Sequence, residues 1–466
     1  MVQKVLSIAI LTVKGAIKQK LVIFLAMALV LSVILLPTFI KHDETATGYA
    51  SIILGYTLTL VTIILGVVTI WLGCSAISKE LEECQMQVLV VKPVSRAQVW
   101  LGKLMGILAI NFVLLGLSAI IISCVLVLKS GELNQSEKEM LNEKILVARS
   151  AVSEETPDLT PFIEERFKTI VEEQDLPSEN WDAVKTQIKA DVEKEYQLVR
   201  PGAARIWQLD FSLKKSKLVD KPLFLRVKMQ TPAFLLDDED PNLYPTVWHI
   251  GKGMAENASF RELNVPVGVW YEFALLPGSI DDDGNLYIMM QNMSNSELLF
   301  PMVDSLEVLY REGGFIANYL RGIFILYCWL ALVAMLALTA SSFLSFSVAA
   351  FLCMTALIIF FSRDAIASTL DTNTILGIDY NDSKNGPTRY YPVIDAIGLP
   401  FLEAIKFALD LIADFSPVDS LSNGRTVGWD QILRAFLQII VLFGGTLSSI
   451  GIFIFQKREI ATAQGK

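Results

Sequence analysis

Residues 80–106 read ELEECQMQVLVVKPVSRAQVWLGKLMG, a charged stretch broken by Pro93 that separates two of the most apolar runs of the chain. The flanking runs, residues 52–77 and 104–128, contain no charged side chain. Each is long enough to cross a bilayer, because a hydrocarbon core of about 30 Å requires about 20 apolar residues in a helix. With 53% hydrophobic residues and a mean hydropathy of +0.48, the 466-residue chain is too apolar for a soluble protein. We therefore predict an integral membrane protein.

Six apolar runs are predicted to be transmembrane helices, which makes the fold class an α-helical polytopic membrane protein. They are residues 21–40, 52–77, 104–128, 322–340, 343–361 and 435–455. An even number of spans places both termini on the same side of the membrane. Lysine and arginine are concentrated before the first run, between the second and third, and after the sixth. The positive-inside rule therefore predicts that both termini and the 78–103 loop are cytoplasmic.

Residues 1–20 have the pattern of a basic amphipathic helix. One helical face is apolar and another carries lysines. The two faces consist of Leu6, Ile10, Val13 and Ile17, and of Lys4, Ser7, Lys14 and Lys18. Such a helix is predicted to lie on the lipid of the inner leaflet. The alternative is that these residues only extend the first span. The first three spans, with the loop between the second and the third, occupy residues 21–128.

Residues 129–314 differ in composition and are predicted to form an extracytoplasmic α+β domain. They contain 33 acidic against 20 basic side chains, and this negative balance argues against nucleic acid as a ligand. Residues 129–200 have helical periodicity. Residues 201–314 contain segments in which apolar and polar side chains alternate, which predicts an antiparallel β-sandwich. These segments are residues 206–213, 223–230, 269–276, 286–293 and 305–310. The five cysteines lie elsewhere in the chain, so the domain is predicted to fold without disulfides.

The remaining chain contains the last three predicted spans. Residues 315–362 hold the fourth and fifth, and residues 435–466 hold the sixth with a cytoplasmic tail. Residues 363–434 between them form a second outer segment. Within it, the stretch PFLEAIKFALDLIADF places Glu403, Lys406 and Asp410 on one helical face and apolar residues on another. This predicts an interfacial or re-entrant amphipathic helix.

The 78–103 loop is the candidate functional segment, because it is a long predicted cytoplasmic segment between the second and third spans. Pro93 interrupts a helix, and Ser95 is suited to cap the helix that leads into the third span. Charges of both signs flank this break, which is typical of a docking surface for a soluble partner. The alternative is a solvated loop whose cations only fix the topology. The candidate docking residues are Glu80, Glu82, Glu83, Lys92, Pro93, Ser95, Arg96 and Lys103.

The segment KPVSRAQVWLGKLMG at residues 92–106, preceded by Glu80 and an apolar LVV, resembles the cytoplasmic loop of type-2 ABC-transporter permeases. The sequences ILTVKGAIKQK at 10–20 and GIFIFQKREIA at 451–461 are similar to the two ends of the same family, as is the order of elements along nearly the whole chain. The resemblance implies that this loop docks into a partner ATPase and that the segment between spans five and six caps the pore. The positions that match are Glu80, Lys92, Pro93, Ser95, Arg96, Gly102 and Lys103. The 129–314 insertion departs from the pattern, since simpler exporters have a short loop there.

The chain lacks a phosphate-binding loop of the form GxxxxGK[ST]. Its two Gly-Lys pairs, at 102–103 and 251–252, have neither the earlier glycine nor the following Ser or Thr. We therefore expect no cofactor in this chain and ATP bound by a separate ABC ATPase subunit. No catalytic set and no metal site are predicted, because His42 and His249 have no ligand-forming neighbours at metal spacing.

The resemblance implies a permease subunit of an ABC-type exporter in the inner membrane of a bacterium, acting as a homodimer or with a related permease. The alternative is a mechanotransmission or envelope-anchoring protein whose outer sandwich acts on a periplasmic partner without cargo crossing the membrane. An enzyme anchored by the spans is a third interpretation, and it lacks an acid, base or nucleophile set. A continuous polar lining between spans would favour transport, whereas a packed apolar centre would favour mechanotransmission.

Overall fold

The computed structural model describes residues 2–39, 46–80, 94–131, 133–154, 157–174, 181–212, 214–218, 221–231, 243–252, 259–302, 305–371, 375, 392–413 and 416–458. The chain forms two compact units. The membrane unit combines Met1–Ala148 with Gly314–Lys466, and the inserted unit is Arg149–Gly313. The inserted unit therefore begins later than the change in composition at residue 129.

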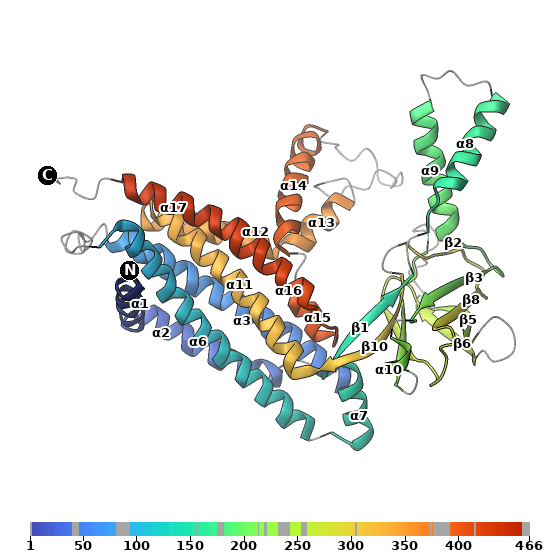
Figure 1. Cartoon of the computed structure of the whole chain (residues 1–466), viewed down its shortest axis with the longest axis horizontal. Helices are drawn as coiled ribbons and strands as arrows, with labels where there is room; N and C mark the ends of the chain where they lie inside the picture. Colours follow the sequence, from blue (N-terminus) through green and yellow to red (C-terminus); the bar gives the residue numbers. More distant parts are fainter. Residues whose placement is uncertain are drawn as a thin grey trace, which may run out of the picture. The chain divides into compact units, whose positions relative to one another are not determined.

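The described part of the membrane unit is helical (Figure 1). Before the inserted unit come α1 (Val2–Ile17), α2 (Lys20–Phe39), α3 (Ala46–Cys74) with a π-helical turn at Ser75–Lys79, α6 (Arg96–Gly131) and α7 (Gln135–Lys144). After it come α11 (Phe315–Ser341), α12 (Phe346–Phe361), α13 (Arg363–Asp371), α14 (Pro392–Ala413), α15 (Pro417–Ser422), α16 (Trp429–Ala435), a π-helical segment Phe436–Gly444 and α17 (Gly445–Lys457).

Four helical stretches of the described chain are long and apolar enough to cross a membrane: Ala50–Ser78, Arg96–Gly131, Phe315–Ser341 and Trp429–Lys457. A fifth is present if the pair Val2–Ile17 and Val22–Leu36, which meet at 74°, makes one bent span. Helix α12 is apolar, but its 16 residues extend only about 24 Å at 1.5 Å per residue. The multi-pass membrane protein is confirmed with four to five spans, and six spans remain a prediction.

Helices α1 and α2 are separated by a break at residues 18–19, and the placement of α1 on the membrane surface stays a prediction. At this break, the indole N–H of Trp71 in α3 donates to the side-chain oxygen of Gln19 at 3.1 Å. The predicted apolar face of α1 is largely exposed, as a surface against lipid would be. Its members Leu6, Ile10 and Ile17 are 58%, 49% and 61% exposed.

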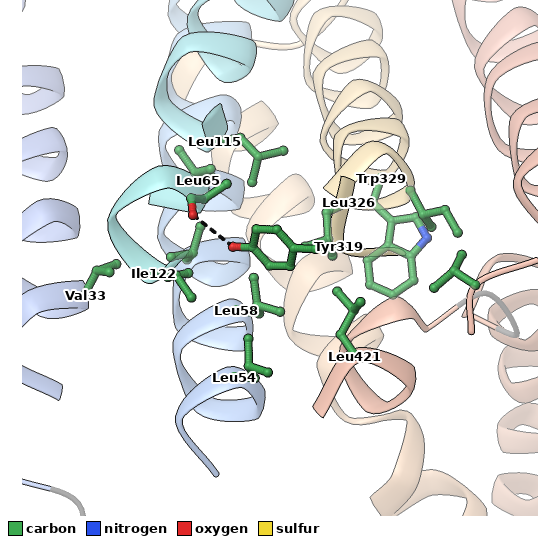
Figure 2. Close-up of a cluster of buried hydrophobic side chains, with 14 of the residues drawn as sticks. Val33, Leu54, Leu58, Leu65, Leu115, Ile122, Tyr319, Leu326, Trp329 and Leu421 are labelled. Carbon is green, nitrogen blue, oxygen red and sulfur yellow. Dashed lines mark hydrogen bonds between the residues drawn. The ribbon is translucent and has the colours of Figure 1, made fainter. Parts of the chain in front are cut away.

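The largest buried cluster of the membrane unit surrounds α3 (Figure 2). Leu54, Leu58 and Leu65 of α3 are fully buried and share this cluster with side chains of α6 and α11. Across it, Tyr319 of α11 donates its hydroxyl to the Ala119 carbonyl of α6 at 3.2 Å, which satisfies the polar end of a buried side chain. Helix α3 therefore forms the centre of the described bundle.

One asparagine fixes the segment between α15 and α16 to the start of α11. The buried Asn318 side chain donates to the Arg425 carbonyl and accepts the Val427 N–H, each at 2.7 Å. In the same segment Gly424 has φ +65°, and a side chain there would collide with the carbonyl of Lys144 at the end of α7. This outer connection is therefore packed closely against the helices of the membrane unit.

Helix α14 contains the predicted amphipathic stretch. Leu409 is buried, and Asp410 on the charged face forms an ion pair with Arg363 at 3.0 Å. The described part of the stretch, residues 400–413, is helical and Asp410 ties it to the start of α13, while its interfacial or re-entrant placement stays a prediction.

The inserted unit contains two four-stranded sheets, ordered β1-β10-β4-β7 and β3-β8-β5-β6, and a two-stranded ladder of β2 and β9. The strands are β1 (Val147–Ser153), β2 (Leu198–Val199), β3 (Ala204–Asp210), β4 (Leu223–Val227), β5 (Leu243–Gly251), β6 (Ser259–Pro266), β7 (Tyr271–Ala274), β8 (Asn285–Asn292), β9 (Leu298–Leu299) and β10 (Leu306–Gly314). Strand β4 pairs antiparallel with β7 and β10, and β8 pairs antiparallel with β3 and β5. The antiparallel sheets are confirmed.

Side chains from both large sheets form one hydrophobic cluster. In β8, Leu286, Ile288 and Met290 are fully buried while the residues between them are partly exposed, which is the alternation expected of a strand with one face on a core. At the centre, the rings of Trp207 and Trp248 stack with centroids 6.2 Å apart. The shared cluster supports the arrangement of the two sheets as a sandwich, which stays a prediction.

The inserted unit also contains helices α8 (Thr160–Gln174), α9 (Trp181–Gln197) and the short α10 (Lys215–Leu218). Arg205 joins α9 to the second sheet, because its guanidinium stacks on Tyr196 at 4.7 Å and pairs with Glu154 at 3.3 Å. Tyr196 also donates its hydroxyl to Glu154 at 3.1 Å. Burial, together with the Glu154 carboxylate, raises the pKa of Tyr196 above its ordinary value.

The first prediction is that residues 147–314 expressed alone form a soluble domain that unfolds cooperatively without an oxidant. Strands β1 and β10 at its two ends lie in one sheet, and the hydrophobic cluster is enclosed within the unit. Denaturant transitions followed by tryptophan fluorescence and by circular dichroism should coincide. Trp248→Ala should lower the free energy of unfolding by about 3–5 kcal/mol. Separate transitions by the two probes would contradict an independently folded domain.

Candidate functional site

The helix that follows the candidate loop begins with a capping box. The Ser95 hydroxyl accepts the Gln98 N–H at 3.3 Å, and the Gln98 side chain accepts the Ser95 N–H at 3.2 Å. Helix α6 then runs without interruption from Arg96 to Gly131. The end of the loop is therefore joined rigidly to a membrane-spanning helix.

Lys103 lies about two turns into α6, with a side chain that is only 3% exposed. Its ammonium group pairs with Glu80 at 2.6 Å and donates to the Ala76 carbonyl at 2.6 Å. Ala76 belongs to the π-helical turn that follows α3, so the cation lies at the carboxyl end of a helix, where it is favoured. The other end of the loop is thus also anchored, through Glu80, to α6.

Arg96 connects α6 to the end of α17. Its guanidinium donates to the carbonyls of Phe455 at 3.2 Å, Gln456 at 2.7 Å and Arg458 at 2.7 Å. The last carbonyls of a helix have no partner within the helix. Arg96 supplies that partner here and places a positive charge where the helix dipole is negative.

Arg458 repeats this arrangement on the next helix. Its guanidinium donates to the carbonyls of Ser341 at 3.4 Å and Ser342 at 2.9 Å, at the end of α11. The Ser78 hydroxyl of the π-helical turn lies 3.1 Å from the same Ser341 carbonyl and 3.0 Å from that of Leu344.

These contacts close a ring that joins the ends of four elements, which we call the polar ring. Glu80 and Lys103 link the π-helical turn to α6, Arg96 links α6 to α17, Arg458 links α17 to α11, and Ser78 links α11 back to the turn. The members of the polar ring are Ser78, Glu80, Arg96, Lys103, Ser341, Ser342 and Arg458. Both ends of the candidate loop attach to this ring.

Helix α1 packs against the same part of α6. A side chain at Gly102 would lie 2.7 Å from Ile8, and one at Gly106 would lie 2.7 Å from Thr12. Two glycines four residues apart form the small-residue face that allows membrane helices to approach closely. The terminal helix is therefore fitted to the first three turns of α6.

Residues 6–141 match the family model described as ABC-2 family transporter protein. These residues carry a type-2 ABC-transporter permease domain. Comparisons with curated proteins and with solved structures gave no match for the chain. Members of this family are membrane transporter subunits that are not themselves enzymes and that work with an ATPase, so the match indicates a permease subunit.

The permease domain includes all eight predicted docking residues, of which the structure describes half. Glu80, Arg96 and Lys103 lie together in the polar ring, and Ser95 is the cap of α6. The others, Glu82, Glu83, Lys92 and Pro93, lie outside the described residues. The predicted N-cap at Ser95 is confirmed, and the docking role of the set stays a prediction.

Sequence reasoning missed Arg458 and Gly106, and it named Gly102 only as a position that matches the family and not as a helix contact. The glycines had a usable signal, because GKLMG is a GxxxG pattern at the start of an apolar run. The only sequence signal for Arg458 was its position after the last span, and this position was interpreted as a topology signal. Its partner carbonyls on α11 are more than a hundred residues away in the sequence, so the contact could not be found from local pattern.

The second prediction concerns the ion pair of Glu80 and Lys103. Glu80→Ala should lower stability by about 1–3 kcal/mol, because it leaves a buried ammonium with one carbonyl partner. Adding Lys103→Met should recover part of that loss, since the unpaired charge is then removed as well. Thermal unfolding of the purified permease in detergent measures the double-mutant cycle.

The exposed cation Lys457 at the same end of the bundle provides the control. Lys457→Met should change stability by no more than about 0.5 kcal/mol. Additive losses from Glu80→Ala and Lys103→Met would show that the two side chains do not depend on each other.

Proposed function

We propose that this chain is the transmembrane subunit of an ABC-type exporter that moves a substrate out of the cytoplasm with ATP hydrolysed by a separate subunit. The observation that carries the proposal is the permease domain at residues 6–141, which includes the whole 78–103 loop. In this proposal ATP binds to the ATPase, and the permease provides no cofactor site.

The ATPase is proposed to dock on the loop between its two anchored ends. Glu82, Glu83, Lys92 and Pro93 would form the contact surface. Glu80, Arg96 and Lys103 would hold the loop ends, because their charged groups are already bonded within the permease. Ser95 would start the helix that carries the contact into the membrane.

We place the substrate route between two permease copies, either a homodimer or a pair with a related chain. The described interior of one membrane unit contains a large apolar cluster, so we place no route through a single copy; by the criterion given above, a packed apolar centre favours the mechanotransmission alternative. Buried hydroxyls of α3 donate to carbonyls of their own helix, and the hydroxyl of Thr69 also lies 3.0 Å from the amide oxygen of Asn111 in α6. These are the hydroxyls of Thr57, Thr62 and Thr69.

The inserted unit is proposed to lie outside the inner membrane, where its acidic surface would face a periplasmic partner. This orientation follows from the positive-inside rule applied to the loop and both termini.

The third prediction tests this orientation. A cysteine at the exposed Asp282 of the inserted unit should react with a membrane-impermeant thiol reagent added outside intact cells. A cysteine at Ser95 should react only after the membrane is opened. Both should be placed in a chain in which Cys84 of the loop and the exposed Cys124 are replaced by serine. Labelling of Ser95→Cys in intact cells would reverse the topology and remove the loop from the cytoplasm.

The fourth prediction tests the docking surface. The double change Glu83→Lys with Lys92→Glu should abolish co-purification of the ATPase, because reversing desolvated interface charges costs about 2–5 kcal/mol. Permease abundance and insertion should persist, since the seven members of the polar ring are unchanged in this variant. Co-purification from membranes, with ATPase activity of the eluate, is the measurement.

A matched swap in the inserted unit serves as the control. Lys189→Glu with Glu193→Lys reverses an exposed pair of α9 while keeping the net charge. This variant should retain the ATPase at the wild-type ratio. Retention of the ATPase by both double mutants would leave the loop as a topology signal only.

A further inference from the structure

We infer that Arg96 and Arg458 carry movement of the docking loop to α17 and α11, and through α11 to the outer segment that contains α15. This inference rests on the proposed function, because it assigns positioning residues to the same permease–ATPase coupling. The polar ring supports this inference, because each of the two arginines bonds to a helix other than its own.

The first step is the contact between α6 and α17. Arg96 is the first residue of α6, directly after the loop, and its guanidinium bonds three carbonyls at the end of α17. A guanidinium is planar and holds its donors in a fixed fork, so it transmits position better than a flexible amine. A shift at the start of α6 therefore displaces the end of α17.

The second step joins α17 to α11. Arg458 bonds the last carbonyls of α11, and further into the membrane the Thr339 hydroxyl donates to the Leu447 carbonyl of α17 at 2.9 Å. A Cβ at Gly451 would lie 2.7 Å from the hydroxyl oxygen of Thr339, so the glycine leaves room for this side chain between the two helices. Closely packed interfaces of this kind move together and do not deform gradually.

The third step runs the length of α11. Its 27 residues span about 40 Å, from the polar ring to the Asn318 contact at the opposite end. There Asn318 holds the segment that follows α15, and Leu421 of α15 packs against Gly322. Movement of α11 therefore acts on α15, whose Ser422 is only 8% exposed and receives a hydrogen bond from Ser51 of α3.

A cysteine at Ser422 provides the readout. Cysteine differs from serine only in having sulfur in place of oxygen, and position 422 is buried in this structure. The reaction of this cysteine with a charged thiol reagent therefore reports opening of the outer segment. The background should carry serine at Cys124 and Cys84. The measurement is the ratio of labelling rates of the purified permease–ATPase complex with ATP and vanadate to those without nucleotide.

In the Ser422→Cys chain with both arginines intact, this ratio should be well above one. Arg458→Gln should lower it toward one while the ATPase remains bound, because the bonds from the end of α17 to the end of α11 are lost although the docking loop is intact. Arg96→Gln should have the same effect at the preceding link. Lys457→Gln is the matched control, since this neighbouring cation lies over the Phe453 ring and not in the polar ring, and it should keep the elevated ratio.

The inference is overturned if either arginine variant keeps the elevated ratio, or if the chain with both arginines shows no dependence on nucleotide while its ATPase is bound and active. Where Arg458→Gln fails to accumulate, Arg96→Gln carries the test alone. Failure of the proposed function gives a different result, namely that no ATPase co-purifies even with both arginines intact. If Lys457→Gln also brought the labelling ratio to one, any charge change at this end of the bundle would have that effect. This result would also overturn the role of the two arginines.

Discussion

An ammonium group buried at the end of a helix bundle needs both an opposite charge and a hydrogen-bond acceptor, because an unpaired buried charge is costly. Lys103 finds both after α3, in the Glu80 carboxylate and the Ala76 carbonyl. This contact fixes the start of α6 to the end of the central helix of the bundle. Since Glu80 and Arg96 lie near the two ends of the loop, their contacts hold those ends while the sequence between them can vary.

The same principle explains why cations recur at this end of the membrane unit. Each of Lys103, Arg96 and Arg458 occupies the carboxyl end of a different helical element, where carbonyls lack partners and the dipole is negative. By the positive-inside rule, positive charges on this side are also predicted to set the topology. One group of residues therefore serves two purposes, and the interpretation of the loop cations as topology signals and their role in holding the bundle do not exclude each other.

Much of the fold could be predicted, because apolar length and alternation are local properties. All five predicted strand segments contain strands, among them β3 and β8. Strand β1 was missed inside a region of helical composition, since its partner β10 follows in the sequence by more than 150 residues and sequence pattern does not report such pairing. Helix α12 was read as a full span from its composition, although only 16 residues adopt helical structure.

The candidate site was predictable only in part, for a physical reason. Ser95 and the charges of the loop have local signals, whereas the partners of Arg96 and Arg458 are backbone carbonyls. Every residue carries a carbonyl, so no residue type marks these acceptors in the sequence. The face of α1 shows the same limit, because its apolar stripe was recognised but the buried side proved to be that of Ile8, Ala9 and Ala16.

The distribution of glycine and polar contacts defines which parts of the membrane unit can move as bodies. Gly102 and Gly106 bring α1 onto α6, Gly73 brings α3 onto α11, and Gly451 brings α17 onto α11. Between these tight contacts, polar bonds are concentrated at the two ends, at the polar ring and at Asn318. Hydrogen bonds to backbone carbonyls can be exchanged for water or for neighbouring carbonyls at modest net cost, whereas a close-packed glycine contact has no equivalent substitute. We therefore expect the bundle to rearrange by movement of rigid helices that exchange hydrogen-bond partners at their ends. The polar ring is at the end of the bundle to which the 78–103 loop is attached.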